Sequence, residues 1–187
     1  MLSLLDSVIS LNSVIWLFLI AFIIHDLEEI IFVESWMKKN YNYIQQKTPS
    51  LFKKSIESLN SIRSDRFAFA VFLLLIVFIP ATWLAAEKQY YLFFVGFNLA
   101  LLVHVFAHLG HSLFLMRYTP GVLTALFLIL PYSIYLLYRL FSAKLIDLDL
   151  LFISLPVGIF LIPIVLVGHW LSRLVFRFNR EGLREYL

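Results

Sequence analysis

The sequence predicts an all-α protein: a polytopic membrane helix bundle of five transmembrane helices, with the N-terminus outside and the C-terminus in the cytoplasm. Three observations support this class: the composition, five long apolar segments, and the distribution of lysine and arginine. Of the 187 residues, 61% are hydrophobic and 14% are charged, and the mean hydropathy is +0.89. Soluble domains carry about 25% charged residues. We therefore expect an integral membrane protein, with residues 1–187 forming a single bundle.

The apolar segments are long enough to cross a bilayer, which takes about 20 residues of helix. The expected spans cover residues of about 8–35, 67–86, 90–116, 121–141 and 149–176. The first span lacks a basic start and a small-residue cleavage pattern, so we expect it to be retained rather than removed as a signal peptide. Pro156 and Pro163, together with Gly158 and Gly168, predict that the fifth helix is kinked.

Lysine and arginine predict the orientation of the bundle. With five spans, twelve of the fifteen lie on one side, in the loop after the first span, after the third span and at the C-terminus, and only Lys88, Arg139 and Lys144 lie opposite. Basic residues favour the cytoplasmic side, which places the long loop and the C-terminus there. An even number of spans would remove this asymmetry. We interpret the net charge of +3 as a topology signal rather than a nucleic-acid signal, and the lack of cysteine excludes thiolate metal sites.

The long loop, residues 38–66, contains a second helical pattern. Apolar residues recur at Phe52, Ile56, Leu59 and Ile62, with basic residues around them. This spacing is typical of an amphipathic helix lying on the inner leaflet, and a solvated linker is the alternative.

Four ionisable residues interrupt the first span: His25, Asp26, Glu28 and Glu29. Each costs about 2.5–3.5 kcal/mol or more at the centre of a bilayer helix, so such a cluster indicates a functional site. On a helix, positions i, i+3 and i+4 share a face, so His25, Glu28 and Glu29 point in similar directions, with Asp26 at the edge of that face.

The other histidines lie on the third and fifth spans. His104, His108 and His111 form a narrow stripe on the third span, and His169 lies on the fifth. Spans one, three and five run in the same direction, and these histidines lie at similar distances from the basic inner boundary. We therefore expect the acidic and imidazole groups to form one layer in the inner half of the bilayer.

A divalent metal ion would explain this layer. Carboxylates in lipid need a positive partner, and a cation can bind carboxylates and neutral imidazoles together. Mixed His and Glu ligands suit zinc or iron, and we favour zinc. The candidate metal ligands are His25, Glu28, Glu29, His104, His108, His111 and His169. Proton transfer and a purely structural polar layer are the alternatives.

The chain resembles the HXXEE-domain family of small bacterial integral membrane proteins. Two stretches support the resemblance: the signature residues His25, Glu28 and Glu29, and the third-span histidines followed by Arg117-Tyr118-Thr119-Pro120-Gly121-Val122-Leu123-Thr124. The resemblance implies a multi-pass protein of the bacterial inner (cytoplasmic) membrane. An enzymatic role is suspected in that family from its His and Glu residues, and the reaction is left open.

The leading hypothesis is a metal-dependent membrane hydrolase. The signature can be compared with the H-x-x-E-H helix of inverted zincins, although here Glu occupies the last position. His25 and Glu29 would be ligands, Glu28 the general base, and Tyr118 or a histidine would stabilise the oxyanion. Without a soluble domain to capture a polar molecule, we expect a lipid or another apolar substrate, with membrane lipids as partners.

Two other functions remain open. A non-haem diiron lipid oxidase or hydroxylase would use a similar histidine box, but membrane desaturases have about eight histidines in several boxes, and this chain has five in all. A metal or proton transport or binding protein could use the same layer, although the sequence contains no repeated halves.

Overall fold

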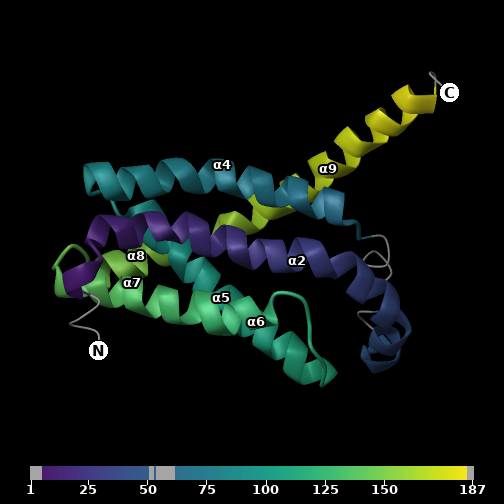
Figure 1. The fold of residues 1–187 in the computed structure, drawn as a ribbon, viewed down its shortest axis with the longest axis horizontal. Coiled ribbons are helices and arrows are strands. Elements are labelled where there is room, and N and C mark those ends of the chain that lie inside the picture. Colours follow the sequence, from purple (N-terminus) through teal and green to yellow (C-terminus); the bar gives the residue numbers. More distant parts are fainter. Residues whose placement is uncertain (1–5, 51–52, 54–61, 185–187) are drawn as a thin grey trace.

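The computed structural model describes residues 6–50, 53 and 62–184, with side chains up to residue 176, and these residues form helices and no strands. Figure 1 shows long helices lying alongside one another. The elements in chain order are α2 (Leu11–Lys47), α4 (Ser64–Lys88), α5 (Leu92–Leu115), α6 (Val122–Thr124), the π-helix η2 (Ala125–Ile129), α7 (Leu130–Ser142), α8 (Leu148–Ile159) and α9 (Leu161–Arg184). The predicted all-α class is confirmed.

Four helical stretches in the described chain are long and apolar enough to cross a membrane. They are Ser64–Lys88, Leu92–Leu115, Val122–Ser142 and Leu148–Phe176, which correspond to the second to fifth predicted spans. The first predicted span forms the N-terminal part of α2, which carries the ionisable cluster and is not among the four. The membrane class is therefore confirmed, whereas the count of five and the orientation stay predictions.

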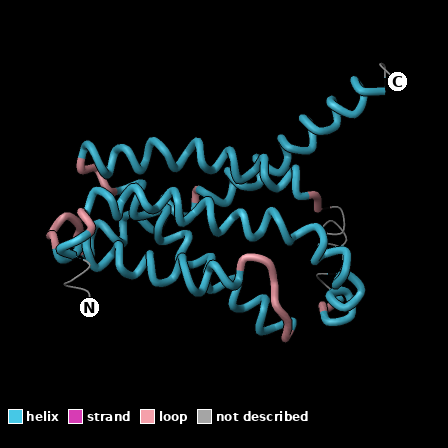
Figure 2. The backbone as a smooth tube through the Cα atoms, viewed as in Figure 1, coloured by secondary structure: helices cyan, strands magenta, loops and turns pink. Residues whose placement is uncertain are grey.

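The chain connections gather at two opposite ends of the bundle. The α4–α5 turn and the α7–α8 turn lie at one end, and the end of α2, the start of α4 and the α5–α6 turn lie at the other (Figures 1 and 2). Lys88 ends α4 and Arg117 follows α5, so the two residues belong to opposite ends, whereas the orientation of these ends across a membrane stays a prediction.

Phenylalanines from three helices make the centre of the core. Phe18 of α2 contacts Phe78 of α4 and Phe94 of α5, with ring centroids 5.2 and 5.1 Å apart. Phe78 also contacts Phe22 and Phe97, at 4.7 and 5.1 Å. These edge-to-face and tilted contacts hold α2, α4 and α5 together.

Small residues bring α5 and α8 into close contact. A Cβ on Gly96 would lie 2.6 Å from the Ser154 carbonyl oxygen, and a Cβ on Gly158 would lie 2.6 Å from the Gly96 carbonyl oxygen. Backbones approach this closely only where a side chain is missing, which is how membrane helices gain van der Waals contact.

The last predicted span is broken into two helices. α8 ends at Ile159, Phe160 is a turn, and α9 begins at Leu161. Pro156 and Pro163 flank the break, and each lacks the backbone N–H that would continue the helix. The predicted kink is therefore confirmed.

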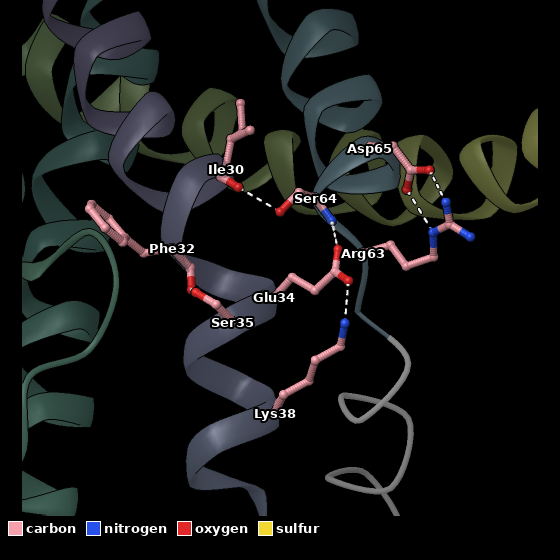
Figure 3. A network of polar contacts seen from close by, with 8 residues as sticks. All are labelled: Ile30, Phe32, Glu34, Ser35, Lys38, Arg63, Ser64 and Asp65. Atoms are coloured by element: carbon pink, nitrogen blue, oxygen red, sulfur yellow. Dashed lines mark hydrogen bonds and ion pairs between the residues drawn. The ribbon is translucent and has the colours of Figure 1, made fainter.

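The start of α4 is tied to α2 by a polar network, shown in Figure 3. The Ser64 hydroxyl donates to the Ile30 carbonyl at 2.6 Å, and the Ser64 N–H donates to Glu34 Oε2 at 3.0 Å. Glu34 also pairs with Lys38, and Arg63 pairs with Asp65, a contact that raises the Arg63 pKa. This network positions α4 against the C-terminal half of α2.

The loop predicted to contain a surface helix is only partly described. Residues 38–47 continue α2, and Ile62 packs near Met37, Ile44 and Leu115. The predicted helix through Phe52, Ile56 and Leu59 lies outside the described residues.

Candidate metal site

Two helices bring four potential ligands together. α2 contributes His25 and Glu29, α5 contributes His104 and His108, and one donor atom from each lies within 4.8 Å of all the others. His25 is 1% exposed, and the Glu29 and His108 side chains are 12% and 8% exposed. The His104 side chain is 46% exposed, so this ligand forms the open side of the group.

The donor atoms face one another closely. Glu29 Oε1 lies 3.0 Å from His108 Nε2 and 3.9 Å from His104 Nε2. The two Nε2 atoms lie 2.8 Å apart. When both imidazoles are neutral, at most one of these two Nε2 atoms can carry a proton in the contact, so at least one Nε2 offers a lone pair. Ligand atoms around a tetrahedral zinc lie about 3.3 Å apart, from Zn–N distances of about 2.0 Å, so small side-chain shifts would fit an ion.

His25 has a defined hydrogen-bonding state. Its Nδ1 lies 2.9 Å from Thr124 Oγ1, and Thr124 Oγ1 donates to Glu28 Oε2 at 2.6 Å. Since the threonine proton goes to Glu28, His25 Nδ1 must donate its own proton to the threonine oxygen. Its Nε2 is then an acceptor, and this atom is buried without a hydrogen-bond partner. A hydrogen bond from one ring nitrogen to a neighbouring side chain, with the other nitrogen left free, is typical of a metal-binding histidine.

Glu28 holds the turn after α5. Its Oε1 accepts from the Tyr118 hydroxyl at 2.6 Å, and its Oε2 accepts from the Thr124 N–H and hydroxyl at 2.9 and 2.6 Å. Burial and the bond to Glu28 raise the pKa of Tyr118, which lies in this turn, so its hydroxyl stays protonated and donates. Glu28 is buried but lies outside the group of four.

Gly121 lets the same turn lie directly against the ligands. Its φ is +87°, and a Cβ there would lie 2.5 Å from His108 Cε1 and 2.8 Å from Glu29 Oε1. Both the backbone conformation and the contact exclude a larger residue. The turn therefore covers the group on the side away from its open edge.

A cavity adjoins the group. It has a volume of about 390 Å³ and is lined by residues of α2, α4, α5, α8 and α9. Its polar lining residues are His25, Asp26, Glu29, His104 and His169, and the remaining lining residues are apolar. Asp26 is 7% exposed, and its Oδ2 has no hydrogen-bond partner. This volume lies at the lower end of the range of small-molecule sites, which is about 300–1,000 Å³.

The structure brings together four of the seven predicted ligands. Glu28 lies beside the group and bonds the turn, His111 is exposed on α5, and His169 lies on α9 along the cavity wall. His111 and His169 are not within the group of four. The catalytic roles predicted for Glu28 and Tyr118 stay predictions.

The sequence analysis assigned no role to Thr124, which hydrogen-bonds to His25, or to Gly121, which packs against Glu29. Both lie in the segment Arg117–Thr124, which had been noted only for its family resemblance. The glycine after a proline was the available signal, since Pro-Gly marks a tight turn.

Comparison with known proteins assigns the chain to a family and leaves the reaction open. A family described as "Protein of unknown function with HXXEE motif" matches residues 16–136, which include all four grouped residues and the Gly121 turn. The chain is 29% identical over 158 residues to "Uncharacterized protein YrkK" of Bacillus subtilis (strain 168), covering 79% of this chain and 88% of that protein. No solved structure matches. The chain belongs to the HXXEE family.

Proposed function

We propose that this protein is an intramembrane metalloenzyme that holds one divalent cation, zinc in preference to iron, and hydrolyses a lipid or another apolar substrate. One observation carries the proposal: His25, Glu29, His104 and His108 converge within 4.8 Å, and the buried Nε2 of His25 has no partner. An unpaired buried nitrogen is costly, and an ion bound at this point would remove that cost.

The charge of the site also supports a cation. Glu29 is paired only with His104 and His108 among the ion pairs of the described residues, and Glu28 bonds the uncharged Tyr118 and Thr124. A divalent ion would neutralise these carboxylates while binding neutral imidazoles. Three imidazoles and one carboxylate form a donor set that suits zinc or iron better than magnesium or calcium.

The proposed chemistry is ester or amide hydrolysis at the edge of the cavity. A bound zinc lowers the pKa of its water to about 7, which supplies a nucleophile near neutral pH. In the overall reaction the water oxygen bonds to the acyl carbon and the acyl bond to the leaving group breaks. One proton of the water goes to that leaving group, and the other goes with the acid that forms. His104 belongs both to the group of four and to the cavity wall, so a substrate in the cavity would approach the ion beside this residue.

We propose a positioning role for Glu28 alongside its predicted role as general base. Its side chain accepts hydrogen bonds from Tyr118 and Thr124 of the turn, and Thr124 in turn orients His25. A Glu28→Gln variant separates the roles: an amide preserves part of the bonding to the turn and cannot take up a proton. If the protein retains zinc and loses hydrolysis, Glu28 acts on the reaction as well as on the turn.

Metal analysis of the purified protein tests the proposal. The full chain in detergent, with His108→Ala, Glu29→Ala and the control His111→Ala, is analysed for its metal content. We expect about one zinc per chain in the unmodified protein and in the control, since His111 lies outside the group, and little in the other two. An absence of metal in the unmodified protein, or full metal in His108→Ala, would overturn the proposal. Two irons per chain would favour the diiron oxidase instead.

A further inference from the structure

We infer that the cavity beside the ligands binds an uncharged amphiphile carrying a hydroxyl group, which donates a hydrogen bond to Asp26, and that the cavity discriminates against anionic lipids. This inference deepens the proposed function and rests on it for the reacting end of the molecule. The binding preference itself is a property of the metal-free cavity, because a bound zinc ion would attract an anionic group.

The shape and lining of the cavity favour an amphiphile. Five helices contribute to its wall, and the lining away from the polar residues is apolar, including Phe22, Leu74, Phe78, Leu101 and Leu161. Such a wall accepts a hydrocarbon chain. The cavity volume of about 390 Å³ suits a molecule at the small end of the range of ligand sizes.

Asp26 supplies a binding group that the proposed metal does not use. It lies on the cavity wall, is 93% buried from the surface and falls outside the group of four ligands. Its Oδ2 has no partner among the described residues. A buried polar oxygen without a bond is unfavourable unless something pairs with it, and a donor on a bound molecule would do so.

The charge of the lining selects the kind of donor. Asp26 and Glu29 both lie on the wall, and none of the described lining residues is lysine or arginine. A phosphate or carboxylate group would face two acidic side chains without a cationic partner, whereas a hydroxyl group can donate to Asp26 at no such cost. The chemistry thus points to an uncharged, alcohol-bearing molecule such as an ester of glycerol.

The test compares three probes with the same tail. The full-length protein, freed of metal with a chelator and placed in phosphatidylcholine nanodiscs, is titrated calorimetrically with 1-O-decylglycerol, its 2,3-di-O-methyl ether and decyl phosphate, and empty nanodiscs correct for partitioning. We expect decylglycerol to bind about tenfold more tightly than either other probe, the effect of one buried hydrogen bond. Equal binding of the ether, or a preference for the phosphate, would overturn the inference without any mutation.

A variant pair assigns the effect to Asp26. Asp26→Leu should bind decylglycerol no better than the ether, and Asp149→Leu, a change at an exposed aspartate in the first turn of α8, should bind like the unmodified protein. Decylglycerol binding by Asp26→Leu at full affinity would contradict the assignment.

The same titration with and without zinc separates the two proposals. A decylglycerol preference in protein that takes up no zinc would support this inference and overturn the proposed metal function. Zinc binding without the preference would do the reverse.

Discussion

His25 Nδ1 lies 2.9 Å from Thr124 Oγ1, although the two residues are 99 positions apart in the chain. This bond joins the HXXEE helix α2 to the turn that follows the histidines of α5. It links the two stretches that carry the family resemblance into one unit, in which Thr124 accepts a hydrogen bond from His25 and donates one to Glu28.

Thr124→Val should weaken zinc binding about 10–100-fold while the fold is kept, because the substitution preserves shape and removes the group that orients His25. A competition titration against a zinc chelator measures the affinity. The matched control is Thr82→Val: Thr82 is also buried, but its hydroxyl donates within its own helix to Phe78 at 2.8 Å. Equal zinc affinities for the two variants would show that His25 does not depend on Thr124.

Gly121→Ala should lower both thermal stability and zinc content. The residue has a φ of +87°, which costs a non-glycine residue about 1–2 kcal/mol, and the added Cβ would overlap His108 and Glu29. Gly110→Ala is the control, since a Cβ on that helical glycine meets nothing within 4 Å, and alanine favours the helix by up to about 1 kcal/mol. Thermal unfolding in detergent and metal analysis compare the two. An unchanged metal content in Gly121→Ala would contradict the close packing of the turn on the ligands.

Ser64→Ala should lower the free energy of unfolding by about 1 kcal/mol, because it removes the hydroxyl bond from α4 to Ile30 of α2. Ser35→Ala is matched to it: the Ser35 hydroxyl donates to Phe32 within α2 and ties no second helix (Figure 3). Unfolding by a denaturing detergent compares the variants. If Ser35→Ala were as destabilising as Ser64→Ala, the contact between the two helices would carry no stability of its own.

Single cysteines test whether α2 crosses the membrane, which would make five spans. The chain has no cysteine, so each introduced thiol is the only one. An impermeant maleimide should label Val8→Cys and Lys144→Cys in intact cells, and Lys47→Cys only after permeabilisation. All three positions are exposed. Labelling of Val8→Cys and Lys47→Cys from the same side would mean that α2 does not span, and that the orientation inferred from lysine and arginine needs revision.

The meeting of α2 and α5 was predictable from helical spacing together with the depth of each residue in the bilayer. His25 and Glu29 are four residues apart, as are His104 and His108, so each pair shares a helix face. Similar distances from the basic boundary placed these faces at one depth. The break near Phe160 was predictable for a similar reason, because Pro156 and Pro163 cannot continue backbone hydrogen bonding.

The positions of Thr124 and Gly121 beside the ligands could not be predicted from the spacing of residues along a helix. Thr124 reaches His25 only because the chain reverses after Met116 and Gly121 adopts a positive φ, a geometry specific to that turn. His111 continues the α5 stripe in sequence, yet it is exposed, because α2 faces only part of that stripe. Which of several aligned side chains meets a partner is decided by helix packing, which no single-helix pattern specifies.

The two halves of the site are synthesised at different times, because α2 precedes α5 in the chain. Glu29 precedes His104 by 75 residues, so a ribosome delivers the carboxylates of α2 well before the imidazoles of α5 exist. Until α5 arrives, the nascent α2 has acidic groups without their histidine partners and is unfavourable in lipid. Stable integration of α2 is thus expected to be late and dependent on its downstream partner, and nascent chains truncated before residue 104 should be poorly retained in the bilayer.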